Sequence, residues 1–83
     1  MNMKVSVKFF SYFRQIVGAD QLSVDLDGDA TMAGLLNLLS ERFDNPAFKD
    51  DWAVAIVNQT KADPETVLKD GDSVLLLPVL GGG

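Results

Sequence analysis

The feature that most constrains this fold is one long amphipathic helix pattern set among segments that are typical of strands. Between Thr31 and Phe43, apolar residues recur at the spacing of one helical face, and Thr31 is a good N-cap residue. Gly34 weakens this helix slightly and would permit close packing on a strand. Four other segments alternate apolar and polar residues or form continuous apolar runs, as half-buried and buried strands do. They are Met3 to Phe9, Leu22 to Leu26, Trp52 to Val57 and Val74 to Val79.

The order of these segments predicts the architecture. A shorter helical pattern, Ser11 to Val17, follows the first strand, and Gly18 suits its left-handed C-terminal position. Asp63-Pro64 predicts a brief helical turn before the last strand. That last strand is too apolar for an exposed edge, so we expect it in the centre of the sheet beside the first strand. The sequence thus predicts an α+β fold of the β-grasp (ubiquitin-like) class: a mixed sheet with one main helix packed on one face, a single domain over residues 1–80 and a flexible glycine tail, 81–83.

Composition excludes several classes of protein. The 83 residues include no Cys and no His, which removes thiol catalysis, disulfides and the commonest transition-metal ligand. The start has no signal-peptide pattern, and no apolar stretch is long enough to span a membrane, so we expect a cytoplasmic protein. The net charge of −5 disfavours nucleic-acid binding. This charge fits a protein partner with a basic patch, although it would also serve solubility alone.

A calcium loop is the one metal site that the sequence suggests at first. Asp25, Asp27 and Asp29 stand at alternate positions, as in the first half of such a loop. The positions that need a glycine and a final carboxylate hold Ala30 and Leu36 instead. We therefore interpret the segment as a turn followed by a helix cap, and expect no metal.

A candidate surface for a partner follows from strand alternation. Phe10 points away from Phe9 and the core, and Leu75 or Leu77 should share its face if the first and last strands are neighbours. Arg14 could pair with a carboxylate of a partner or form a local salt bridge. The residues that we predict to bind a partner are Phe10, Arg14, Leu75, Leu77, Pro78, Val79 and Leu80.

The chain stops at three consecutive glycines, Gly81, Gly82 and Gly83. Such a tail cannot pack in a core, and with Leu80 it can extend roughly 14 Å beyond the sheet. It is thin enough to enter a narrow channel of another protein and to present its terminal carboxylate there. A frayed terminus is the alternative that glycines alone leave open.

Three further motifs favour the first interpretation. Phe9 to Gly18 resembles the family segment FFxxxRxxxG, and Val57 to Thr60 resembles the strand end VNxx. Asp70 to Val74, with Leu77-Pro78 and the terminal diglycine, resembles DGDxVxxxPPVxGG. In order and spacing the chain resembles the small subunit of molybdopterin synthase, the MoaD group of the ubiquitin-like sulfur carriers. It departs from that pattern at Leu76, Leu77, Val79 and Gly81.

The resemblance implies a carrier rather than an enzyme that is catalytic alone. A ubiquitin-activating-type adenylyltransferase would use ATP to adenylate the Gly83 carboxylate, and a sulfur donor would convert it into a thiocarboxylate. The large catalytic subunit of molybdopterin synthase, in a heterotetramer, would then take the tail and pass the sulfur to a cyclic pterin precursor of the molybdenum cofactor. The carrier itself would bind no cofactor.

Three alternative functions remain open from the sequence. The same fold could carry sulfur for thiamine or for tRNA thiolation, although the short helix with Arg14 is absent from the compact thiamine-type carriers. It could instead be a modifier that forms isopeptides with lysines. An ordinary β-grasp interaction domain, with no chemistry at its tail, is the third.

Overall fold

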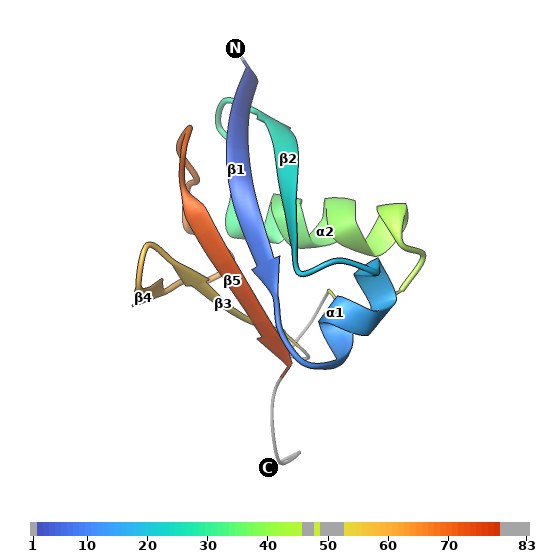
Figure 1. The fold of residues 1–83 in the computed structure, drawn as a ribbon. Coiled ribbons are helices and arrows are strands. Elements are labelled where there is room, and N and C mark those ends of the chain that lie inside the picture. The colour runs from blue at the N-terminus through green and yellow to red at the C-terminus, as the bar shows by residue number, and fades with distance from the viewer. Residues whose placement is uncertain (1, 46–47, 49–52, 79–83) are drawn as a thin grey trace.

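The computed structural model describes residues 2–45, 48 and 53–78. Its elements alternate strands with two helices, and Figure 1 shows their arrangement. In chain order they are β1 (Asn2–Phe9), α1 (Tyr12–Val17), β2 (Gln21–Asp27), α2 (Met32–Arg42), β3 (Ala53–Val57), β4 (Thr60–Lys61) and β5 (Ser73–Pro78). Within those residues, no helix is both long and apolar enough to cross a membrane.

All five strands form one mixed sheet in the order β2-β1-β5-β3-β4. The central pair, β1 and β5, is parallel, and the other three pairs are antiparallel. The prediction that the last strand lies beside the first is therefore confirmed. An apolar strand such as β5 is stable in this position because both of its backbone edges are paired and one of its faces is covered by the core.

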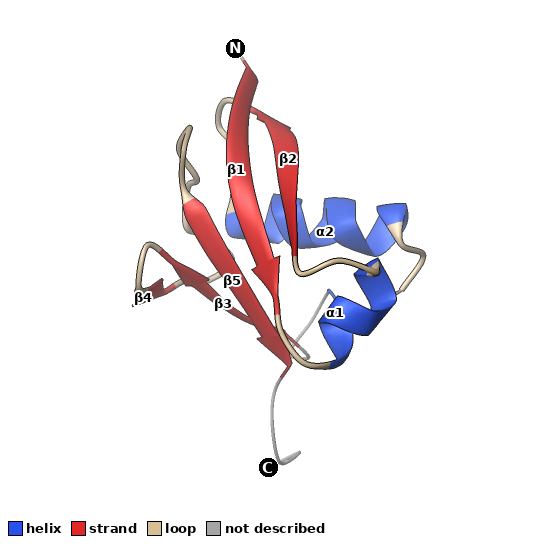
Figure 2. Cartoon of the chain, in the orientation of Figure 1, coloured by secondary structure: helices blue, strands red, loops and turns tan. Residues whose placement is uncertain are grey.

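The hydrophobic core lies between the sheet and the two helices. Alternate residues of β1, from Met3 to Phe9, are buried in this core, and the intervening residues face the other way. Figure 2 shows α2 crossing behind β1 and β2. From the helices, Phe13 of α1 and Leu35 and Leu39 of α2 join the same cluster.

The C-terminus of α1 and the N-terminus of α2 are capped as the sequence predicts. Gly18 caps α1 with a φ of 80°, and its N–H donates to the carbonyl of Arg14 at 2.9 Å. Thr31 caps α2, and its Oγ1 accepts a hydrogen bond from the N–H of Gly34 at 3.2 Å. The expectation that Gly34 packs closely on a strand is wrong, because Gly34 is exposed and a Cβ there would meet only Thr31 Oγ1, at 3.7 Å.

One local prediction needs correction. Asp63-Pro64 does not start a helical turn: the backbone N–H of Asp63 donates to Thr66 Oγ1 and the N–H of Thr66 donates back to the carbonyl of Asp63, which closes a simple turn. The polar segment after β3 is a two-residue hairpin loop, because Asn58 and Gln59 both have positive φ. This loop pairs β3 with the short strand β4, which the sequence analysis did not foresee.

Phe48 is a core residue that no periodic pattern marked. Its ring stacks on Phe13 at a centroid distance of 4.9 Å and meets the edge of Phe9 at 6.3 Å. A single aromatic residue in an otherwise charged segment thus closes one end of the core. The predicted strand ends at Trp52 and Val79 lie outside the described residues.

Candidate docking face and carboxyl-terminal strand

The sheet face opposite the helices carries a row of apolar side chains. Lys8 of β1 is aligned with Leu75 of β5, and Ile56 of β3 is aligned with Leu75 from the other side. Two residues away along each strand, Val54 is aligned with Leu77. Residues directly opposite in neighbouring strands share a face, so all five lie on the side away from the core.

Phe10 extends this row past the end of β1. Its N–H donates to the carbonyl of Leu76 at 3.1 Å, so the β1–β5 ladder continues one residue further. Phe9 is fully buried whereas Phe10 is half-buried, and Lys8 Nζ lies 5.6 Å from the centroid of the Phe10 ring. The register thus gives Phe10 and Leu77 the common face that alternation predicts.

We call this set the docking face: Phe10, Val54, Ile56, Leu75 and Leu77. Each of the five is half-buried in the free chain. A continuous apolar group of this kind on the open face of a sheet marks a site for a partner more often than singly scattered apolar residues do. Its role in binding stays a prediction.

Strand β5 connects this face to the end of the chain. It lies in the centre of the sheet, and its last residue, Pro78, is buried and paired with Ala53. Pro78 therefore lies on the core side of β5, with its side chain covered in the free chain. The other predicted tail residues are Val79, Leu80, Gly81, Gly82 and Gly83, and they lie outside the described residues.

Arg14 lies apart from the docking face, on α1. Its Nη1 is 3.7 Å from Asp20 Oδ1, and both side chains are more than half exposed. The local salt bridge that the sequence offered as an alternative is therefore present. At such exposure the pair contributes little to stability, so Arg14 can also exchange Asp20 for a carboxylate of a partner.

A shallow hollow borders the docking face at its β3–β4 end. It has a volume of about 400 Å³ and is lined by Asn58, Gln59, Ser73 and Leu75. Hydroxyl and amide groups surround one apolar wall there, which suits a polar side chain of a docked protein. No sequence pattern marks Asn58 and Gln59 as site residues, because the hollow depends on the register between β3 and β5.

The sequence of this chain matches the model of a known protein family. The model of the ThiS family matches residues 7–83, which is most of the chain. The chain belongs to the ThiS family. The match covers all five residues of the docking face together with the C-terminal segment.

Individual relatives of this ThiS-family chain fall into two groups by name. The molybdopterin synthase sulfur carrier subunit of Escherichia coli is 33% identical over 81 residues, which covers 95% of this chain and 99% of that protein. Small archaeal modifier protein 3 of Haloferax volcanii is 32% identical over 92 residues, which covers 98% of this chain and 100% of that protein. The predicted resemblance to the molybdopterin synthase small subunit is thus confirmed at the level of the family.

Solved structures confirm the β-grasp fold. A putative molybdopterin converting factor subunit 1 from Pyrococcus furiosus matches with a TM-score of 0.84 at 28% identity, covering 94% of this ThiS-family chain and 99% of that one. The ubiquitin of Caldiarchaeum subterraneum matches with a TM-score of 0.70 at 16% identity, over 100% of both chains. At that identity the likeness shows the fold alone.

Proposed function

We propose that this chain is the sulfur carrier subunit of a molybdopterin synthase, and that its working group is the C-terminal carboxylate of Gly83. The observation that supports this best is the position of the docking face. Its central strand β5 ends at Pro78, and residues 79–83 follow directly in the sequence. A partner that binds the docking face is therefore within reach of the chain terminus.

The proposed chemistry activates that terminus in two steps. A carboxylate oxygen of Gly83 attacks the α-phosphate of ATP, and pyrophosphate leaves. Hydrosulfide sulfur from a donor then attacks the acyl carbon, and AMP leaves with its bonding electrons, so that a thiocarboxylate remains. Adenylation is needed because an ionised carboxylate is a poor electrophile without a leaving group.

The carrier contributes position rather than catalysis in this scheme. The sequence holds no Cys or His. Among residues 2–45, 48 and 53–78, no three carboxylates are grouped as metal ligands would be. ATP would bind to the activating adenylyltransferase, and sulfur transfer to the pterin precursor would take place in the large catalytic subunit. Binding of the carrier to the large subunit would hold the tail in that site. The reaction between two molecules then proceeds as if both groups belonged to one molecule.

Protein modification is the second candidate function. It is favoured by the relative named small archaeal modifier protein 3, which this chain matches over that protein's full length. Both functions begin with an adenylated Gly83 and diverge afterwards. In the modifier, a lysine amine would attack the activated terminus in place of sulfur, and an isopeptide would result.

Intact-mass measurement separates these functions. The full chain is incubated with an activating adenylyltransferase of its own source, ATP and sulfide, and its mass is compared before and after. We expect the exchange of one oxygen for one sulfur, and then transfer of that sulfur to a cyclic pterin precursor when the large subunit is added. Covalent ladders on other polypeptides would support the modifier instead. Loss of the sulfur only to thiamine precursors or tRNA would assign a different carrier role.

A further inference from the structure

Strand β2 forms one edge of the sheet, and β1 is its only neighbour among the described strands. Across this pair the N–H of Phe9 donates to the carbonyl of Asp20, directly opposite, at 2.8 Å. Hydrogen-bonded and non-hydrogen-bonded pairs alternate along antiparallel strands. The β2 backbone groups that face β1 therefore belong to Leu22, Val24 and Leu26.

The intervening residues of β2 turn their backbone groups outward. Ser23 and Asp25 direct both N–H and carbonyl away from the sheet, and within the described part of the chain no backbone group bonds to them from that side. The carbonyl of Asp27 is already used, since it accepts from the N–H of Ala30 at 3.1 Å. The free edge thus runs from Gln21 to Asp25, long enough for a second strand to pair with it.

A cleft lies beside this edge. It is open to solvent and has a volume of about 520 Å³. Its apolar wall comes from β2, the following loop and α2, and its rim is acidic. The wall includes Leu26, Ala30 and Leu38, and the rim includes Asp25, Asp27 and Asp29. An apolar side chain of a paired strand could enter the cleft while a neighbouring basic one meets the rim.

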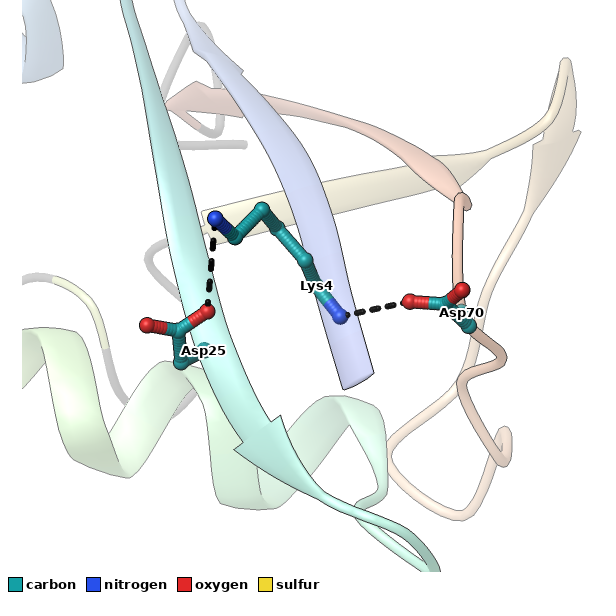
Figure 3. A network of polar contacts seen from close by, with 3 residues as sticks. All are labelled: Lys4, Asp25 and Asp70. Carbon is teal, nitrogen blue, oxygen red and sulfur yellow. Dashed lines mark hydrogen bonds and ion pairs between the residues drawn. The ribbon is translucent and has the colours of Figure 1, made fainter. Parts of the chain in front are cut away.

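The charges beside the edge are mostly uncompensated. Asp25 lies 3.8 Å from Lys4 Nζ on β1, and Figure 3 shows this pair together with the hydrogen bond from the Lys4 backbone N–H to Asp70. Both Lys4 and Asp25 are well exposed, so the pair is weak and exchangeable. Asp27 and Asp29 are exposed and have no ion pair within the described residues.

We propose that the β2 edge pairs with an extended segment of a partner protein in which basic and apolar residues alternate. Side chains of Ser23, Asp25 and Asp27 face the open side of the sheet, and those of the intervening residues face α2. A strand added to this edge follows the same alternation. Its residues on the open side meet carboxylates and are basic, whereas those on the α2 side meet the cleft and are apolar.

Charge argues for such a partner rather than for a second copy of this chain. A copy would bring the same aspartates to the same edge, and each molecule carries a net charge of −5. Like charges opposed across two strands are destabilising. A basic segment instead gains both the backbone pairing and attraction between opposite charges.

This inference does not rest on the chemistry of the tail. The docking face is built from β1, β5 and β3, whereas the proposed segment binds at the outer edge of β2. A failure at either site would leave the other untouched, and both partners could be held together.

The test is a titration of the full-length, nitrogen-15-labelled chain with a synthetic six-residue peptide of alternating lysine and valine. We expect amide shifts confined to β2 and the cleft, and binding that weakens as salt is added. Replacing the lysines of the peptide with glutamate should abolish the shifts. Shifts at the docking face instead, equal binding of the glutamate peptide, or no binding would overturn the proposal.

Four variants of the chain sharpen the result. Ser23→Pro removes an outward N–H and should weaken binding at least about tenfold, because proline is tolerated at an edge but cannot donate to a new strand. Ser23→Ala is its matched control and should bind as the original chain does. Asp27→Asn should reduce the dependence of peptide binding on salt concentration.

Gly34→Leu should fill the cleft, and it tests peptide binding at the β2 edge if Ser23→Pro fails to fold. Unchanged binding by the folded Pro and Leu variants would exclude edge pairing, and self-association in sedimentation would point to a second copy instead.

Discussion

Asn58 and Asp72 are joined by a side-chain hydrogen bond that links the β3–β4 hairpin loop to the start of β5. Asn58 Nδ2 donates to Asp72 Oδ1 at 2.9 Å, and Asn58 Oδ1 accepts from the N–H of Ser73 at 3.0 Å. The second carboxylate oxygen of Asp72 accepts from the N–H of Lys69 at 2.8 Å. Asp72 is only 9% exposed, so these bonds replace most of the water that its carboxylate would otherwise bind.

Replacing Asn58 with alanine should lower the free energy of unfolding by about 2 kcal/mol, because two hydrogen bonds are lost and a nearly buried carboxylate loses a donor. Urea denaturation measures the change. Asn58→Gly is the matched control, since Asn58 has a φ of 49° and glycine adopts that conformation without strain. If Asn58→Gly were as stable as the original chain, the backbone conformation and not the hydrogen bonds would be decisive.

Gly34→Ala should raise the free energy of unfolding by about 0.5–1 kcal/mol, because alanine favours the helix and the site is open. The new Cβ would meet only Thr31 Oγ1, at an ordinary contact distance of 3.7 Å. Thermal melting measures the gain. Gly18→Ala has the opposite expected sign, since Gly18 holds a φ of 80°. A loss of stability in Gly34→Ala would mean that the first turn of α2 needs glycine for another reason.

Phe10→Asp should weaken binding to the large subunit of molybdopterin synthase by about 2 kcal/mol while the fold survives, because in the proposed complex this side chain, which lies outside the core, would act as an aromatic anchor. Calorimetric titration of the two subunits measures the affinity. Phe9→Asp is the contrasting variant and should not fold, since Phe9 is 1% exposed. Unchanged affinity in Phe10→Asp would move the docking site elsewhere on the chain.

Deleting Gly82 and Gly83 should leave thermal stability almost unchanged and abolish sulfur transfer. Terminal glycines carry no side chain and seldom add stabilising contacts. Paired melting curves and the intact-mass assay give the two readouts. A large drop in melting temperature would show that the tail packs on the domain, and retained sulfur transfer would exclude Gly83 as the carrier of sulfur.

The sequence alone predicted both helices, four of the five described strands and the place of the last strand beside the first. The alternation along β1 and β2 and the apolar face of α2 are patterns among residues close together in the sequence. Hydrophobic periodicity detects patterns over that short range. The central place of β5 followed from its apolar character, because an edge position would leave it exposed. The motifs near Phe10 and at the C-terminus were enough to suggest the family whose model matches residues 7–83.

Tertiary structure alone decided the features that depend on register. Phe48 joins the core from a charged segment, and Asn58 meets Asp72 across 14 positions of the sequence. The outward backbone of Ser23 is likewise fixed by which residue lies opposite it on β1. A shift of one residue in strand pairing would reverse every such relationship while leaving each local pattern unchanged. Local sequence therefore specifies which elements form, and the packing of the core selects the one register in which their surfaces meet.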